Sequence, residues 1–343
     1  MRVQTALDTF VSEHTAALSE ISTDTHAAVT ALSDFISSGK RFRPACCYWG
    51  HLGAGGEDSE AIVVASAALE LLQAAALIHD DVMDRSDTRR GQPSVHRRFE
   101  ALHRQERMQG DSEQFGLAGA ILAGDLALVW TDIMFYASGF DAHTLARGKR
   151  ILDDMRTELM AGQYLDVFEQ ARGGGDVDRA LRVIRYKTTA YTIERPLHLG
   201  AALAGAGPHV FAAYSNFAVP LGEAFQLRDD LLGVFGDPEE TGKPAGDDLR
   251  EGKRTVLLAL ARSCASSQEQ ADLTTLIGDP NLDEAGVNRV RAILENTGAL
   301  ADVETRIATN RDRALAALES PAITSDGAAM LREIAIAATD RTA

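Results

Sequence analysis

The sequence predicts an all-α protein, a single-domain multi-helix bundle around a central cavity that covers residues 1–343. The helix formers Ala, Leu, Glu and Arg dominate, and residues 61–78 contain many of them in succession. No series of short alternating strands bounded by turns occurs, and strands do not alternate with helices. No stretch is long or biased enough to read as a domain linker, and no repeat of fixed period is evident.

Glycine and proline residues divide this pattern into about ten expected helices. Pro44 falls near an expected helix start, where its fixed φ angle is tolerated. The segments IVVASA and RVIRY have some β character, but each lies inside a longer helical pattern, so we expect both to be helical. The expected connections cover residues 51–58, 104–114, 171–177, 235–253 and 278–283.

Composition narrows the classes of function. The formal net charge of −16 argues against broad, nonspecific binding of nucleic acid. Three cysteines, Cys46, Cys47 and Cys264, lack the spacing of a disulfide framework, which favours reduced thiols in the cytoplasm. Residues 1–20 are amphipathic and carry acids, unlike a signal or transit peptide. We therefore expect a cytoplasmic protein.

Residues 115–140 form an apolar stretch long enough to cross a bilayer. Asp125 and Asp132 interrupt it and no basic residues mark its ends, so we expect no transmembrane segment. A helix that is apolar nearly all round is instead expected to be buried on both sides, in part against another subunit.

The first acidic motif, DDVMD, ends an apolar helix. Asp80 and Asp84 are four residues apart, so on a helix their carboxylates lie on one face and can share hard cations. Oxygen ligands of this kind suit Mg²⁺, which commonly bridges carboxylates to substrate phosphates. Arg89 and Arg90 follow closely, and guanidinium groups bind phosphate oxygens through paired donors. Together with Asp81, these residues predict a metal–diphosphate site.

A second basic cluster lies in the segment SGKRFRP. Lys40 and Arg43 are three residues apart and would project from one side of a helical turn. On its own this pattern is equally typical of basic residues near a helix end that interact favourably with the helix dipole.

A second acidic pair, Asp229 and Asp230, also follows an apolar helical stretch, and Lys243 and Lys253 lie in the polar segment behind it. Two such helix ends, each followed by cations, predict two helices that face one cavity, with metal ions clamping a diphosphate between them.

These motifs together resemble the trans-isoprenyl (polyprenyl) diphosphate synthases, and among them most of all the geranylgeranyl diphosphate synthases. The resemblance runs from about Gly39 to Lys253 and covers GKRFRP, DDVMD with RRGQP, GQYLD, KTTAY, and QLRDD with TGKPAGDDLREGK. It implies a homodimer, three Mg²⁺ ions, and condensation of isopentenyl diphosphate with an allylic diphosphate of five, ten or fifteen carbons.

The resemblance also implies roles for single residues. Metal ligands would be Asp80, Asp84 and Asp229, supported by Asp81, Asp166 and Asp230. The catalytic set would be these motif acids, Asp80, Asp81, Asp84, Asp229 and Asp230, with Lys187. The allylic diphosphate would be held by Arg89, Lys187, Thr188, Gln226, Lys243 and Lys253, and isopentenyl diphosphate by Lys40, Arg43, Gln73 and Arg90.

One position departs from the family pattern. The second motif is commonly DDxxD, but here it reads DDLLG, so Gly233 stands in place of the third acid. Asp237, four residues later, is expected to compensate in part.

Product length is expected to depend on the helix that ends at Asp80. Ala75 and Ala76 lie about 6–7.5 Å before it along the axis. In the family, aromatic residues at these positions stop growth at fifteen carbons, and alanines leave the pocket open. Leu71 and Leu72, one turn further, narrow it again. We therefore expect geranylgeranyl diphosphate as the product, with farnesyl or longer products as alternatives. The structural alternative is that the two alanines merely permit close helix packing and do not set product length.

Two other functions remain open at this point. A class I terpene cyclase shares the first motif and the helical fold, but it usually carries an Asn/Ser/Glu metal triad where this chain has QLRDD. A non-catalytic synthase subunit tends to lose motif aspartates, and Gly233 gives that reading some support. His79 and His96 flank the first motif, and we expect both to be structural.

Overall fold

The computed structural model describes residues 2–172, 176–236 and 246–339, and it is helical almost throughout, which confirms the predicted all-α class. The chain falls into two compact units. Unit 1 comprises Met1–Tyr48 and Glu57–Ala146, and unit 2 comprises Trp49–Gly56 and Arg147–Ala343. The single domain expected from the sequence stays a prediction.

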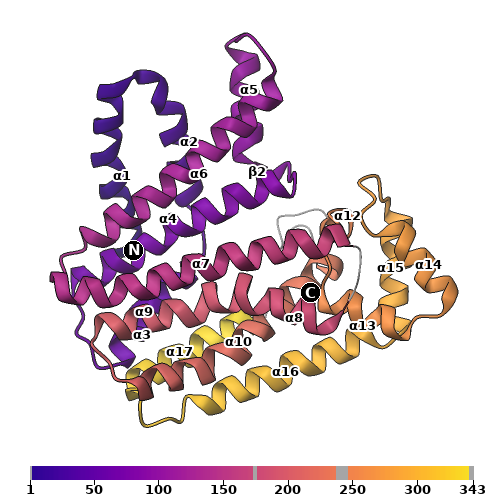
Figure 1. The fold of residues 1–343 in the computed structure, drawn as a ribbon. Coiled ribbons are helices and arrows are strands. Elements are labelled where there is room, and N and C mark those ends of the chain that lie inside the picture. Colours follow the sequence, from indigo (N-terminus) through magenta and orange to yellow (C-terminus); the bar gives the residue numbers. More distant parts are fainter. Residues whose placement is uncertain (1, 173–175, 237–245, 340–343) are drawn as a thin grey trace. The chain divides into compact units, whose positions relative to one another are not determined.

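Unit 1 is built around two long helices that pack side by side, α4 (Glu60–Met83) and α6 (Ser112–Tyr136) (Figure 1). Against them lie α1 (Arg2–Ile21), the short 3₁₀ turn Thr23–Thr25, α2 (His26–Ile36) and α5 (Val95–Gln105). A small hairpin of β1 (Thr88–Arg89) and β2 (Gln92–Pro93) joins α4 to α5, and α3 (Phe42–Gly53) begins in this unit.

The start, course and end of α4 follow from its sequence. The side chain of Ser59 caps the first turn by accepting a hydrogen bond from the backbone N–H of Ile62 (3.5 Å). A run of Ala, Val, Ile and Leu then buries most of the helix surface. The close approach of α4 to α6 requires a small residue at position 124 of α6, because a Cβ on Gly124 would lie 2.2 Å from the Nε2 atom of His79. The helix thus delivers Asp80 and Asp84 at its carboxyl end.

Unit 2 centres on α10 (Pro208–Phe235), which packs against α16 (Ala299–Ala317) and against a π-helix, Ile184–Glu194, labelled η2. Arg228 of α10 binds Glu304 of α16 through two hydrogen bonds of 2.7 and 2.8 Å. The remaining helices of this unit in the described residues are α7 (Ala142–Arg172), which begins in unit 1, α8 (Val177–Val183), α9 (Arg195–Leu203), α12 (Asp247–Arg250), α13 (Val256–Cys264), α14 (Ser267–Leu276), α15 (Glu284–Asn296) and α17 (Ser325–Thr339).

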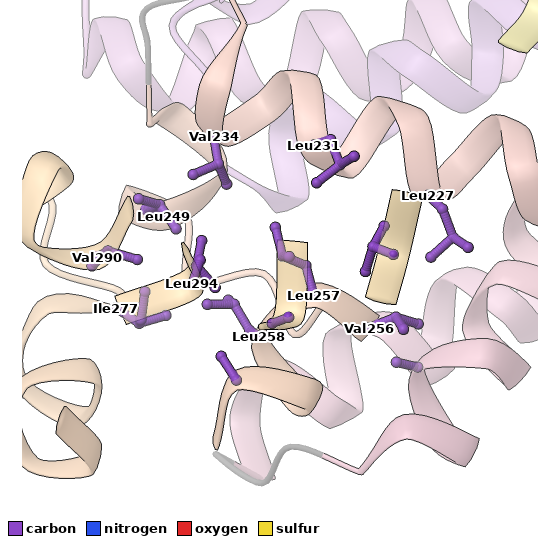
Figure 2. Packing of buried hydrophobic residues seen from close by; sticks show 14 of the residues in the cluster. Leu227, Leu231, Val234, Leu249, Val256, Leu257, Leu258, Ile277, Val290 and Leu294 are labelled. Carbon is purple, nitrogen blue, oxygen red and sulfur yellow. The ribbon is translucent and has the colours of Figure 1, made fainter. Parts of the chain in front are cut away.

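The carboxyl half of α10 is fixed by a hydrophobic core. Leu227, Leu231 and Val234 recur at helical spacing and are almost fully buried. Figure 2 shows these side chains pointing into an interior shared with Leu257 and Leu294, from α13 and α15. The opposite side of the same helical turns carries Gln226 and Asp229, so burial of the leucines determines where the second acidic motif points.

In the described residues, the secondary structure differs from the sequence expectations in three respects. It contains more helices than the ten or so expected, because the carboxyl-terminal third divides into short helices. The segment RRGQP forms a hairpin, although no strand was expected. RVIRY is helical as predicted, but its last three residues belong to the π-helix. IVVASA lies within α4 and Pro44 in the first turn of α3, as expected.

Among the residues that the structure describes, two helices, α4 and α6, are long and apolar enough to cross a membrane by length and composition. In the most apolar 18-residue stretch of each helix, 72% is buried inside the protein in α4 but only 39% in α6. One side of α6 is left uncovered within a single chain, since Leu122 and Val129 are 66% and 56% exposed. The expectation that another subunit covers part of this helix stays a prediction.

Candidate active site

The first acidic motif presents its carboxylates in two different environments. Asp80 and Asp84 are partly exposed on one face of α4, and the N–H of Asp84 donates to the carbonyl of Asp80 (2.8 Å). Asp81 points inward and is fully buried. The exposed face continues toward the start of the helix through Ala76 and Gln73. Asp80 and Asp84 are thus placed to meet a ligand, and Asp81 to support them.

The hairpin after α4 brings Arg89 back onto these acids. Its two-residue turn, Arg90–Gly91, has positive φ at both positions (55° and 72°), as a type I′ turn requires. Arg89 donates from Nε to the Oδ1 atom of Asp81 (2.9 Å) and again from NH2, and it lies 3.6 Å from Asp80. A buried carboxylate needs such a partner, so the Arg89–Asp81 pair fixes the hairpin.

The predicted basic cluster is real but differs in detail from the expectation. Arg90 donates to the carbonyl of Ser38 (2.9 Å). Burial lowers the pKa of Arg90, and the nearby positive charges of Arg89, Arg41 and Arg43 lower it further. Several cations therefore crowd a small region of unit 1, which is a favourable place for a polyanion.

Two corrections concern the neighbouring residues of this cluster. Lys40 lies in the loop before α3, so it does not share a helical turn with Arg43 as expected. Arg41, which sequence reasoning passed over, anchors this loop: it pairs with Glu70 (2.5 Å), and it also binds Gln4 and the carbonyl of Ile36.

In unit 2 the predicted site residues form two short chains of polar contacts. Lys187, in the π-helix, donates to Asp166 of α7 (2.6 Å). Thr188 donates to the amide oxygen of Gln226 (2.7 Å), and the amide nitrogen of Gln226 donates to Asp230 (2.8 Å). The motifs GQYLD, KTTAY and QLRDD, from three different elements, are thereby brought together.

Two glycines allow the π-helix to approach its neighbours so closely. A Cβ on Gly162 of α7 would lie 2.4 Å from the backbone nitrogen of Lys187, and one on Gly222 of α10 would lie 2.6 Å from the side chain of Thr189. The glycine of GQYLD is therefore a contact surface for the backbone that carries Lys187.

Several carboxyl groups lie close together at the end of α10. Burial raises the pKa of Asp230 to about 8; Asp248 and Asp229 add to this, whereas the hydrogen bond from Gln226 opposes it. Asp229, its neighbour, is exposed. Lys253 pairs with Asp248 (2.7 Å) and Glu251 (2.8 Å), and these carboxylates raise its pKa although burial opposes them. Buried carboxylates of this kind favour the binding of a cation.

Asp248, of α12, lies next to the second acidic motif, and sequence reasoning did not single it out. A Cβ on Gly233 would lie 2.0 Å from its Oδ2 atom, so the Asp248 carboxylate occupies the space beside α10 that a side chain at position 233 would fill. The acidic pair in GDDLREGK was the available signal, but only the fold shows which residue it faces. Asp237 and Lys243, the other residues expected here, lie outside the described residues.

This geometry predicts that an aspartate at position 233, where the resembled family commonly has its third acid, lowers both activity and stability in this protein. Gly233→Asp should lower kcat/KM about fivefold and Tm by a few degrees, because the new side chain displaces Asp248 from a crowded position. Steady-state kinetics and thermal unfolding measure both effects. The double variant Gly233→Asp with Asp248→Gly is expected to recover part of the lost stability. Higher activity in Gly233→Asp alone would contradict the conclusion that Asp248 occupies the space beside position 233.

Both histidines near the first motif have structural contacts. His79 packs over Gly124, and its Nε2 atom is 3.1 Å from the carbonyl of Ile121. His96 is buried beside Ser94 at the start of α5, and burial lowers its pKa. Over residues 2–172, 176–236 and 246–339, no three His, Cys, Asp or Glu side chains already converge as a metal site.

Helical units that present carboxylates beside guanidinium and ammonium groups have the chemistry that binding of a metal and a diphosphate requires. A model of the polyprenyl synthetase family matches residues 26–294. The chain belongs to this family, and it is a prenyltransferase.

Similar proteins agree with this assignment. The geranylgeranyl diphosphate synthase of Mycobacterium tuberculosis is 35% identical over 290 residues, which cover 84% of this chain and 77% of that protein. The geranylfarnesyl diphosphate synthase of Aeropyrum pernix is 35% identical over 274 residues, covering 79% and 80%. A crystal structure of geranylgeranyl pyrophosphate synthase from Corynebacterium glutamicum, complexed with isoprenyl diphosphate and magnesium, matches with a TM-score of 0.96 at 44% identity, covering 99% of this chain and 98% of that one.

Proposed function

We propose that this protein condenses isopentenyl diphosphate with an allylic diphosphate and that its main product is geranylgeranyl diphosphate. The observation that carries the proposal is the pairing of motif acids with cations in each unit: Arg89 with Asp81 and Lys187 with Asp166. The names of the Mycobacterium and Corynebacterium relatives support the twenty-carbon product, and that of the Aeropyrum relative supports a longer one as the alternative.

Divalent cations fit the residues present, because Asp80, Asp84 and Asp229 present carboxylate oxygens that are at least partly exposed. We propose that Asp80, Asp84 and Asp229 hold Mg²⁺, three ions in all, as magnesium accompanies isoprenyl diphosphate in the Corynebacterium relative. Magnesium bound there supplies charge neutralisation, which makes diphosphate a better leaving group. Asp248 takes the place of the missing third acid of the second motif.

The chain's own cations do the rest of the electrostatic work. Arg89, Lys187 and Lys253 are each held by a carboxylate and are therefore oriented before substrate arrives. With Thr188, Gln226 and Lys243, they bind the allylic diphosphate and stabilise the charge that develops on it as its carbon–oxygen bond breaks. Lys40, Arg43, Gln73 and Arg90 bind isopentenyl diphosphate, whose double bond attacks the allylic carbon; the proton then leaves to the departing pyrophosphate.

Product length is proposed to depend on α4, next to Asp80. Ala76 is half-buried on the same face as Asp80, whereas Ala75 and Leu72 are fully buried. We expect Ala76→Phe to shift the product toward fifteen carbons or fewer, because the ring fills the path of the growing chain. Ala75→Phe should act in the same direction, but at a cost in Tm, since it must displace packed neighbours.

Chromatography of radiolabelled products measures this shift, and thermal unfolding separates it from damage to the fold. Ala101→Phe, at an exposed position of α5, is the matched control. An unchanged product distribution in both alanine variants would place the floor of the pocket elsewhere.

The exposed side of α6 supports a homodimer. Phe115, Leu122, Val129 and Tyr136 recur every seven residues, so they form one apolar stripe along the helix, and all four are exposed. A stripe of this kind is suited to packing against a second copy across a two-fold axis.

All three cysteines are free, in keeping with the proposed cytoplasmic location.

Introducing a charge into this stripe should weaken the dimer. Val129→Glu is expected to convert the dimer to monomer at micromolar concentration, because pairing would bury two unpaired carboxylates. Light scattering coupled to size exclusion measures the mass. A native protein that is already monomeric, or a variant that stays dimeric, would contradict the proposed interface.

The function itself is tested by product analysis. The purified protein is incubated with Mg²⁺, isopentenyl diphosphate and, in turn, the five-, ten- and fifteen-carbon allylic diphosphates. We expect geranylgeranyl diphosphate from each of them. Hydrocarbon release from farnesyl diphosphate alone would indicate a terpene cyclase, and absence of any product would indicate a non-catalytic subunit.

A further inference from the structure

The π-helix that carries Lys187 and Thr188 runs for 11 residues, Ile184–Glu194. Such helices are rare, mostly a single turn long, and frequent at functional sites, because their wider hydrogen-bond ring is less stable than that of an α-helix. A longer one needs interactions that stabilise it against relaxation to α. The surrounding side chains of unit 2 supply them.

The first of these interactions joins the two ends of the π-helix. Arg185 lies in its first turn and Glu194 is its last residue, and their side chains form an ion pair of 2.6 Å. Glu194 is 3% exposed, and its other carboxylate oxygen accepts a hydrogen bond from Ser215 of α10 (2.7 Å). Burial alone would raise the pKa of Glu194, but Ser215 and Arg185 outweigh it, so the pKa is lowered.

The contacts continue from Ser215 into two more helices. His198 of α9 lies 3.1 Å from the hydroxyl of Ser215 and 3.2 Å from the carbonyl of Phe211, both through Nε2. Its Nδ1 atom accepts from the guanidinium of Arg195 (3.3 Å), which only donates, so the ring carries its proton on Nε2. Arg195 in turn binds Glu158 of α7 (2.8 Å). The series therefore ties together α7, the π-helix, α9 and α10.

We infer that Glu194 is a positioning residue for the proposed reaction: it holds the π-helix in the register that places Lys187 opposite Asp166 and Thr188 opposite Gln226. A return to α geometry changes the rotation per residue along the segment, so Lys187 would turn away from Asp166. Glu194 acts through the backbone of its own helix, and no contact with substrate is required of it. The inference rests on the proposed function, because the positioned groups are those assigned to the allylic diphosphate.

The inference is tested with Glu194→Gln, which removes the charge and keeps the size of the side chain. We expect the KM for the allylic diphosphate to rise about tenfold, because the ion pair with Arg185 is lost and Ser215 no longer donates to a charged group. The KM for isopentenyl diphosphate should be unchanged, because its proposed ligands lie in unit 1. Glu194→Asp should recover part of the loss. Glu319→Gln, which alters an exposed ion pair with Arg332 in the same unit, is the matched control.

Ser215→Ala is a second test variant that leaves the ion pair between Arg185 and Glu194 intact. It replaces Glu194→Gln if that variant does not fold. It should raise the allylic KM about threefold, the effect of losing one neutral donor. Equal changes in both KM values, or an unchanged allylic KM, would overturn the inference. The native enzyme is measured alongside: if it forms no prenyl product, the proposed function fails instead.

Discussion

Asp80→Ala is expected to lower kcat at least about 100-fold, because a carboxylate that holds a divalent cation contributes several kcal/mol at the transition state. Asp80 lies at the carboxyl end of α4, partly exposed, with Arg89 only 3.6 Å away. The change removes the carboxylate without disturbing the buried pair between Arg89 and Asp81, so the fold should be retained. Single-turnover kinetics with an allylic diphosphate and isopentenyl diphosphate measures the chemical step.

The control for this variant is Asp87→Ala, whose exposed carboxylate pairs with Arg97 (2.7 Å) and has no role in the proposed site. It should retain near-native turnover. Near-normal kcat in Asp80→Ala would remove Asp80 from the mechanism, whatever the behaviour of the control.

Gly162→Ala is expected to reduce kcat/KM for the allylic diphosphate about 30-fold. Its methyl group would lie 2.4 Å from the backbone nitrogen of Lys187, and a backbone inside a packed helix cannot move aside as a flexible side chain does. Lys187 would be pushed from Asp166, and the diphosphate would lose one of its proposed cations.

Ala161→Ser, at the exposed neighbouring position of α7, serves as its control. Steady-state kinetics and thermal unfolding of both variants are compared with the native protein. If Gly162→Ala keeps native kcat/KM, the close packing of α7 on the π-helix has no part in positioning Lys187.

The parts of this structure that followed from the sequence are those governed by local pattern. The apolar run before Asp80 predicted a buried helix with acids at its end, and the run before Asp229 did the same for α10. The positive φ of Arg90 does not show in the sequence, because Arg rarely adopts it. The hairpin that returns Arg89 to Asp81 was therefore missed.

Other features depend on contacts that no local pattern encodes. The π-helix shares its side-chain periodicity closely enough with an α-helix that RVIRY and KTTAY read as ordinary helix. Asp248 faces Gly233 although the two are fifteen positions apart and lie on different helices. Composition predicted an apolar α6, but only the fold shows which of its residues the rest of the chain leaves exposed.

The account is tested most directly by a crystal structure of the protein with Mn²⁺ in place of Mg²⁺ and a non-reactive thiolodiphosphate analogue of farnesyl diphosphate. Anomalous scattering would locate every bound cation. We predict metal ions that join a single diphosphate to Asp80 and Asp84 on one side and to Asp229 on the other. Cations bound to only one of these helices, with the diphosphate held elsewhere, would contradict the proposed shared site.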